Sequence, residues 1–207
     1  YLSSTALFTR YFYTRGIYDI MLVIRDLNNC LDTFRRDNYL TVAKPIANFT
    51  ATPTTGCWPL TVTYRDASTD VPGVTLTGFE WDFGDGGTAI VSVPSVTHTY
   101  VTAGTFTTTE IVTDNLGCKD TVALPLVTVY RPTASFTAST LTPCTGDPVT
   151  FTNTSSGITG SLWLFGDGDT STTTSPTHTY RGPGSYTVRL VVTDSHGCTD
   201  TAVYVGY

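Results

Sequence analysis

The side chains that could carry out chemistry are few in this 207-residue sequence. There are three histidines, and two of them, His98 and His178, hold the same position before Thr-Tyr, while His196 follows Ser195. A Ser-His-Asp site duplicated in this way would be unusual, whereas a histidine that holds a loop by hydrogen bonds would not. The G-x-S-x-G, H-E-x-x-H and phosphate-loop motifs are absent from the sequence. We therefore predict no catalytic residue and no enzymatic activity.

Aspartates beside two Gly-Asp-Gly segments are the candidate ligands for a cation. Asp82 could act as a second ligand next to Asp85, but Leu164 stands in the equivalent place beside Asp167. The sequence has no D-x-[DN]-x-[DN]-G calcium loop and no C-x-x-C zinc spacing. The sequence thus predicts no metal site and no cofactor.

These residues belong to an internal repeat, whose period indicates an array of small units. Residues 97–121 and 177–201 are closely similar, and residues 9–33 form a more divergent third copy. The copies share a glycine, an aspartate and a cysteine, which are Gly16, Gly104 and Gly184; Asp26, Asp114 and Asp194; and Cys30, Cys118 and Cys198.

The front half of the repeat occurs only twice, because residues 44–64 match residues 131–151 and no earlier copy is present. We predict the back half of a first repeat in residues 1–43, a complete second repeat in 44–130 and a slightly shortened third repeat in 131–207. Both ends then cut through repeats, so we expect the chain to be a piece of a longer array.

Composition and alternation predict that each repeat is built of β-strands. The chain has 44 threonines, 12 tyrosines and 10 phenylalanines but one methionine, and β-branched and aromatic residues favour strands. Tyr186, Val188, Leu190 and Val192 alternate with polar and smaller residues, as on a strand with one face in a core. About seven such strands in roughly 80 residues predict an immunoglobulin-like sandwich.

Charge and hydropathy exclude several classes of partner. Charged residues make up 14% of the chain and the net charge is −6, so no basic surface for nucleic acid is expected. No apolar run is long enough to span a membrane, and no signal peptide is visible at the start. Five cysteines without zinc spacing fit an oxidising compartment.

The strings WDFGDG (81–86) and WLFGDG (163–168), each followed by H-T-Y, resemble the signature of the PKD (polycystic kidney disease) domain family. The resemblance implies tandem immunoglobulin-like sandwiches, and the added G-C-x-D-T pattern resembles PKD repeats of large surface proteins of gliding and other Bacteroidota. The residues that form the signature are Trp81, Phe83, Asp85, His98 and Tyr100 in the second repeat, and Trp163, Phe165, Asp167, His178 and Tyr180 in the third.

Two of these features have a functional and a structural interpretation. Trp81 and Trp163 could stack on carbohydrate, but a tryptophan and a phenylalanine two residues apart share one face of a strand and are more simply core. The triplets that contain Thr121 and Thr201 resemble the Asp-Thr-aliphatic O-glycosylation motif of Bacteroidota. Alternatively, these triplets simply begin the last strand.

For function, the resemblance implies a non-enzymatic stalk or adhesin region of a large protein exported by the type IX pathway, which spaces a filament at the cell surface for adhesion or gliding. The alternative is an accessory PKD region of a secreted protease or polysaccharide hydrolase. A second rival is a module that binds a surface glycan or protein through its loops. The expected partners are neighbouring repeats and such a ligand, at an extracellular, cell-surface location.

Glu110 breaks its own repeat, since leucine stands at the equivalent positions 22 and 190. We expect it to be buried, to accept a hydrogen bond from the Trp81 indole and to have a raised pKa. The alternative is a bulge that turns it outward. The loop of residues 68–77 is longer than its counterpart in the third repeat, and we expect it to pack against residues 1–43.

The cysteines allow three outcomes. Cys57 and Cys144 lie in the loop between the first two strands of a repeat, here called the early loop, whereas Cys118 and Cys198 lie in the turn before the last strand, the late turn. Pairing within repeats is the default, yet strands of six or seven residues separate these ends by about 20 Å, and a disulfide needs Cα atoms within about 7 Å. Geometry therefore favours Cys57 with Cys198 across the boundary, and free thiols are the third outcome.

Overall fold

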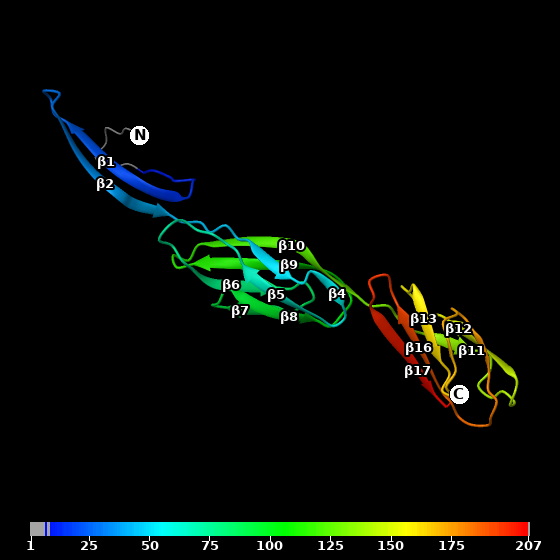
Figure 1. Ribbon diagram of the computed structural model, residues 1–207. Coiled ribbons are helices and arrows are strands. Elements are labelled where there is room, and N and C mark those ends of the chain that lie inside the picture. The colour runs from blue at the N-terminus through cyan, green and yellow to red at the C-terminus, as the bar shows by residue number, and fades with distance from the viewer. Residues whose placement is uncertain (1–6, 8, 207) are drawn as a thin grey trace. The chain divides into compact units, whose positions relative to one another are not determined.

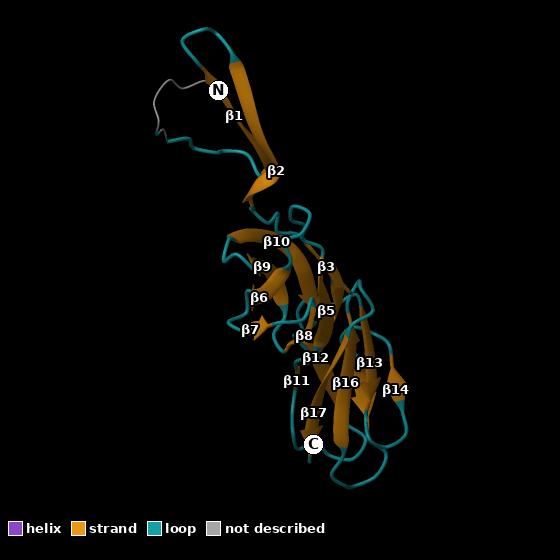
Figure 2. Cartoon of the chain, turned by 90° about the vertical axis from the view of Figure 1, so that its left-hand side faces the viewer, coloured by secondary structure: helices purple, strands orange, loops and turns teal. Residues whose placement is uncertain are grey.

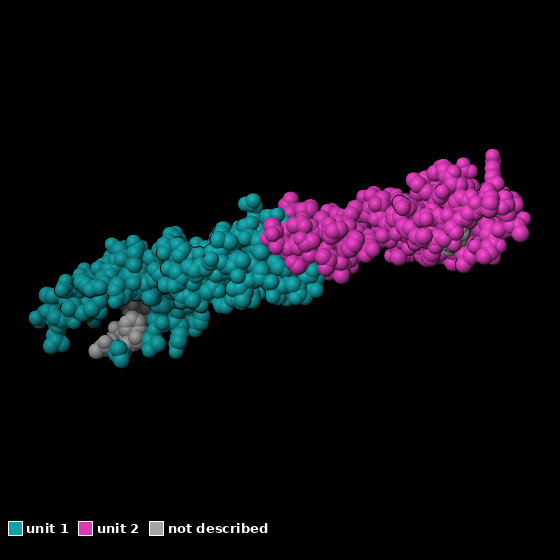
Figure 3. All heavy atoms as spheres, turned by 90° about the horizontal axis from the view of Figure 1, so that it is seen from below, with its two compact units in different colours: residues 1–51, 63–96, 107–124 teal, residues 52–62, 97–106, 125–207 magenta. Residues whose placement is uncertain are grey.

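The computed structural model describes residues 7 and 9–206, and every regular element among them is a β-strand (Figure 2). The predicted all-β class is confirmed. The chain divides into two compact units, residues 1–51, 63–96 and 107–124 on the one hand and residues 52–62, 97–106 and 125–207 on the other (Figure 3). The second unit thus joins the third repeat with the part of the second repeat that carries Cys57.

The described part of residues 1–43 contains one antiparallel hairpin. Its strands are β1 (Gly16–Arg25) and β2 (Leu31–Val42), in a register that places Leu22 opposite Phe34. Apolar side chains on this hairpin remain exposed; Met21, Leu22 and Phe34 each keep more than half of their surface in water.

The second repeat has eight strands in two sheets (Figure 1). The smaller sheet has the order β3-β5-β8, with β3 (Phe49–Thr52), β5 (Leu60–Asp66) and β8 (Ser95–Tyr100). The larger sheet has the order β4-β10-β9-β6-β7, with β4 (Thr55–Cys57), β6 (Leu76–Asp82), β7 (Thr88–Val91), β9 (Gly104–Asp114) and β10 (Lys119–Tyr130). β4 runs parallel to the end of β10, with Cys57 opposite Tyr130.

Aromatic rings fill the core of the first compact unit. The Tyr64 ring lies 5.5 Å from Trp81 and 5.3 Å from Phe83, and Phe49 meets Trp81 edge-on at 5.2 Å. These rings come from strands of both sheets, so their burial holds the two layers together.

The third repeat has seven strands, again in two sheets. One sheet has the order β11-β12-β15, with β11 (Phe136–Ala138), β12 (Pro148–Asn153) and β15 (Thr177–Thr179). The other has the order β14-β13-β16-β17, with β13 (Gly160–Leu164), β14 (Thr170–Ser171), β16 (Thr187–Thr193) and β17 (Thr199–Val205).

The predicted alternation along β16 is confirmed. Val188, Leu190 and Val192 are fully buried, and they pack with Trp163 and Phe165 in the core of the third repeat. The period of two therefore identified the inward face of this strand correctly.

Candidate functional site

The tryptophans of the repeated signature lie in the sandwich cores. Trp81 and Trp163 keep 2% and 0% of their surface exposed, and Phe83 and Phe165 keep 2% each. A ring that stacks on sugar must present a face to solvent. These buried indoles therefore cannot bind sugar in this conformation. The interpretation as core residues is the one that the structure supports.

The third repeat uses its signature residues to hold one loop in place. The Trp163 indole donates to the Thr173 carbonyl oxygen at 3.0 Å, and the Tyr180 hydroxyl donates to the Phe165 carbonyl oxygen at 3.1 Å. His178 is largely buried, stacks on Phe165 at 4.1 Å, and its Nε2 lies 2.8 Å from Asp167 Oδ2. The Asp167–His178 contact ties the Gly-Asp-Gly loop to β15, and the Trp163 hydrogen bond ties the segment after β14 to β13.

The Asp167–His178 pair affects the ionisation of the aspartate. Partial burial opposes ionisation of Asp167, but hydrogen bonds from His178 and from the Asp169 backbone outweigh it and lower the pKa of the carboxyl below its usual value. The pair therefore favours an ionised aspartate, which anchors the loop.

One cluster in the described residues has the donor types of a cation site. Ligand atoms of Asp167, Asp169 and His178 lie within 4.8 Å of one another. However, Gly87 stands in the second repeat where the third has Asp169, and the Asp167 carboxylate is already paired with an imidazole. We assign no metal to this cluster.

Ser195, His196 and Asp194 are neighbours in the late turn, but their arrangement is not that of a catalytic triad. The Ser195 hydroxyl and the Asp194 carboxylate both approach Nδ1 of His196, at 3.4 and 3.9 Å. A triad needs its hydroxyl and its carboxylate on opposite ring nitrogens. The His196 ring instead stacks on Tyr130 at 3.5 Å.

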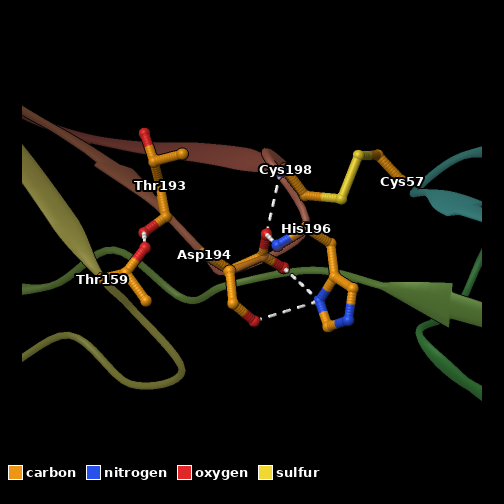
Figure 4. A network of polar contacts seen from close by, with 7 residues as sticks. Cys57, Thr159, Thr193, Asp194, His196 and Cys198 are labelled. Atoms are coloured by element: carbon orange, nitrogen blue, oxygen red, sulfur yellow. Dashed lines mark hydrogen bonds and ion pairs between the residues drawn. A yellow bond between two sulfur atoms is a disulfide. The ribbon is translucent and has the colours of Figure 1, made fainter.

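A disulfide links Cys57 to Cys198 in the structure, with a Cα–Cα distance of 5.3 Å (Figure 4). This is the pairing that strand length favoured over the pairs within repeats. Cys30, Cys118 and Cys144 are free thiols, and Cys30 and Cys144 are exposed. The bond therefore connects the early loop of the second repeat, in which Cys57 ends the short strand β4, to the late turn of the third.

Trp58, the residue after Cys57, makes further contacts at this boundary. Its indole donates to the Val101 carbonyl oxygen at 2.7 Å, and its backbone N–H donates to the Tyr130 carbonyl oxygen at 2.9 Å. The Arg131 guanidinium lies over the ring, 4.0 Å from its centroid. We call Cys57, Trp58, Tyr130, Arg131, His196 and Cys198 the joint; all six belong to the second compact unit.

The joint was only partly visible in the sequence. Cysteine chemistry marked its covalent bond, but nothing singled out Trp58, Tyr130 or Arg131. The signal that could have found them is position, since Trp58 follows the early-loop cysteine and Tyr130-Arg131 spans the repeat boundary.

Sequence reasoning also missed a clamp that occurs once in each complete repeat. Asp120 Oδ2 accepts a hydrogen bond from the Ala47 backbone, and Asp200 Oδ2 accepts one from Ala134, each at 2.9 Å. Each carboxylate thereby fixes the entry of its repeat to the last strand. The aspartate of the Asp-Thr-aliphatic triplet thus has a structural role. The adjacent Thr121 and Thr201 are exposed, and their glycosylation stays a prediction.

Glu110 is fully buried opposite Trp81, so the alternative of an outward bulge is wrong. The expected hydrogen bond is also wrong, because neither the Glu110 oxygens nor the Trp81 indole nitrogen has a hydrogen-bond partner. Burial, reinforced by the charge of nearby Asp66, raises the pKa of Glu110 to about 8, in the predicted direction.

A hydrogen bond joins the loop of residues 68–77 to the N-terminal segment. Arg15 Nη1 donates to the Thr69 carbonyl oxygen at 3.5 Å and to that of Lys44 at 3.4 Å. These three residues lie in the first compact unit. This contact is long and solvent-exposed, so packing of the loop against residues 1–43 stays a prediction.

Proteins of known identity resemble parts of this chain. A "Microbial collagenase" of Vibrio alginolyticus is 44% identical over 84 residues, which cover 38% of this chain and 10% of that protein. "Collagenase ColA" of Bacillus cereus is 61% identical over 36 residues, 17% of this chain and 4% of that protein. "Pre-pro-metalloprotease PrtV" of Vibrio cholerae is 51% identical over 53 residues, 24% of this chain and 6% of that protein. The chain thus spans a tenth or less of these relatives.

Among solved structures, the PKD1 domain of Vibrio anguillarum Epp is 28% identical, with a TM-score of 0.36, and covers 42% of this chain and 96% of its own. No described helix of this chain has the length and apolar character that crossing a bilayer requires. The model of the family described as "PKD domain" matches residues 42–129 and again residues 129–205. With the second and third repeats both matched, this chain belongs to the PKD domain family.

Proposed function

We propose that this chain is a non-catalytic spacer region of an extracellular protein, and that it accompanies a secreted protease. The observation that carries the proposal is the similarity to collagenases and to a pre-pro-metalloprotease, in each of which the matched part is a small fraction of the whole. A segment that recurs beside protease domains while covering so little of them is expected to be an accessory to catalysis.

The joint supports the spacer role in physical terms. A disulfide between repeats needs an oxidising environment, which agrees with an exported protein. Short connections and contacts between neighbouring repeats give an array length and stiffness, so the region would set the distance between a catalytic head and its anchor or substrate.

The experiment that separates the protease accessory from the adhesin stalk is to determine the coding sequence on both sides of this segment. We expect a secretion signal and a metalloprotease domain. A long run of further repeats without a hydrolase, next to a type IX export signal, would instead support the stalk of a surface adhesin used in adhesion or gliding.

A second measurement tests the non-catalytic role directly. The purified chain should not cleave gelatin or casein during an overnight incubation, whereas a secreted bacterial metalloprotease assayed in parallel should. If the chain is cleavage-competent and Asp167→Asn with His178→Ala removes the activity, the accessory role is wrong.

A separate co-sedimentation experiment with insoluble collagen tests whether the spacer also binds collagen, the expected substrate of a collagenase partner.

A further inference from the structure

The late turn has the same bonded shape in all three repeats. In each, one aspartate oxygen accepts hydrogen bonds from the backbone N–H groups two and four residues later, and the last of these residues is cysteine. The distances are 2.8 and 2.8 Å for Asp26 to Asn28 and Cys30, 2.8 and 2.8 Å for Asp114 to Leu116 and Cys118, and 2.8 and 2.9 Å for Asp194 to His196 and Cys198. Each repeat therefore presents a cysteine on a preformed turn.

One of these turns shows what the shape can bind. The Cys198 turn is bonded to the early loop of the second repeat through Cys57, and its His196 stacks on Tyr130. Cys144 occupies the position of Cys57 in the third repeat, and its thiol is free and exposed. We call the end of the third repeat that carries Cys144 the Cys144 end. It is the counterpart of the Cys57 end of the second repeat, where the late turn of the next repeat is bound.

The Cys144 end also has a hollow surface. A cavity of about 360 Å³ opens there, lined among others by Leu141, Pro143, Cys144, Tyr180 and Tyr186. Leu141 is 61% exposed, so an apolar side chain lies open to solvent beside the Cys144 thiol.

Two of the lining residues have counterparts at the end of the second repeat that carries Cys57. Tyr180 stacks on Tyr186 at 4.2 Å in the third repeat, just as Tyr100 stacks on Phe106 at 4.5 Å in the second. The residues after the cysteine differ, because Thr145, which lines the cavity, and Asp147 stand where the second repeat has Trp58 and Leu60. Both are smaller and more polar than the residues that they replace.

We propose that the Cys144 end of the third repeat is a covalent docking site for the Asp-x-x-x-Cys turn of another repeat of this type. Docking brings the two thiols together; each loses its proton, and a sulfur–sulfur bond forms between Cys144 Sγ and the incoming Sγ. The two electrons pass to a small-molecule disulfide oxidant, which is reduced to two thiols. The proposal holds whether the region accompanies a protease or a stalk.

A second copy of the chain is the probe, because its exposed Cys30 lies on such a turn. Isotopically labelled and unlabelled chains are mixed, incubated with reduced and oxidised glutathione, and mapped by mass spectrometry without reduction. We expect mixed-isotope peptides that join Cys144 to Cys30, in about tenfold excess over Cys144–Cys144 and Cys30–Cys30, which corresponds to a docking preference of about 1.4 kcal/mol. Cys57–Cys198 serves as the internal standard and stays intact.

Two variants separate docking from simple thiol exposure. Cys144→Ser should abolish the product that joins Cys144 to Cys30. Asp26→Ala keeps Cys30 but removes the acceptor that shapes its turn, so it should lower the Cys144–Cys30 product several-fold, whereas Asp32→Ala in the same hairpin should not. Products in random proportion, or an Asp26→Ala yield equal to that of the unmodified chain, would show that Cys144 is only an exposed thiol and would overturn the proposal.

Discussion

At the scale of single residues, Glu110 is the clearest conflict between this sequence and its fold. It sits opposite Trp81 on paired strands, in the same register that places Leu190 opposite Trp163 in the third repeat. The leucine fits an apolar core, whereas the carboxyl has lost its water and has no hydrogen-bond partner. A buried group of this kind is kept neutral by holding its proton more tightly than it would in water.

The stability of the second repeat should therefore fall as pH rises. The pKa of Glu110 is about 8 in the folded chain against 4.5 ordinarily, so the folded state binds the proton more tightly than the unfolded state. The stabilisation is complete below about pH 4.5 and is lost as pH approaches 8, with a slope of at most about 1.4 kcal/mol per pH unit. Urea denaturation at a series of pH values measures this slope.

Substitutions at Glu110 check the cause. Glu110→Leu, which copies the third repeat, should flatten the profile and raise the free energy of unfolding at pH 8 by roughly 2–4 kcal/mol. Glu80→Gln, which removes a partly exposed carboxylate on the paired strand, should leave the slope unchanged. A Glu110→Leu profile as steep as that of the unmodified chain would assign the pH dependence to another group.

At the scale of elements, the Gly-Asp-Gly turn requires its first glycine more strictly than its second. Gly84 has φ +82°, and a Cβ there would lie 2.4 Å from the Thr107 carbonyl oxygen; Gly166 repeats this with φ +90° and 2.7 Å to that of Thr187. The turn thus lies directly against the antiparallel neighbouring strand, which is β9 in the second repeat and β16 in the third. Gly86 has φ +94° but open space around it.

Alanine substitutions should separate these two requirements. Gly86→Ala should lower the free energy of unfolding by about 1 kcal/mol, because alanine must adopt a left-handed backbone conformation. Gly84→Ala should lower it by about 2–4 kcal/mol, because its Cβ also clashes with the Thr107 backbone. Thermal unfolding of both variants followed by circular dichroism provides the comparison. Equal losses would mean that the neighbouring strand β9 moves away at little cost.

The hairpin of β1 and β2 is an element whose apolar side chains are largely in water. Leu22 and Phe34 face each other across the strands and are both 58% exposed. Exposed apolar patches of this kind promote association. Replacing both residues with threonine, which also favours strands, should lower the fluorescence of a bound hydrophobic dye and reduce concentration-dependent light scattering. Thr41→Ser is the matched control; if it has the same effect, the apolar pair is not the cause.

At the scale of the whole molecule, the covalent bond of the joint closes a loop between residues 141 positions apart in the chain. Such a bond acts mainly on the unfolded chain, whose freedom it reduces. In the folded chain, Trp58 adds further contacts next to the disulfide. It makes two hydrogen bonds, and the Arg131 guanidinium lies over its indole. The second and third repeats are therefore expected to unfold as neighbours that stabilise each other.

The double variant Cys57→Ser/Cys198→Ser tests this coupling. It should lower the free energy of unfolding by about 2–4 kcal/mol, and treatment of the unmodified chain with a reducing agent should produce the same loss. Cys144→Ser, which removes an exposed free thiol, should leave stability unchanged. A double variant as stable as the unmodified chain would mean that the bridge contributes nothing to folding.

The sequence by itself determined the features that depend on local chemistry. Alternation of apolar and polar residues identified the inward faces of strands such as β16, and the Trp-x-Phe spacing placed Trp163 and Phe165 in the core. Gly-Asp-Gly marked the turns, where the positive φ angles fall on the glycines. These features are readable because a strand has a fixed period of two and because only glycine adopts such backbone angles freely.

Only the tertiary structure decided which distant residues meet. Trp58 lies 43 residues from Val101, and Asp120 lies 73 residues from Ala47, so no local pattern links the members of either contact. The Glu110 carboxyl was correctly predicted to be buried, since that follows from its face of the strand. Its lack of a hydrogen bond from Trp81 was not, because register places two side chains opposite each other without orienting their polar atoms.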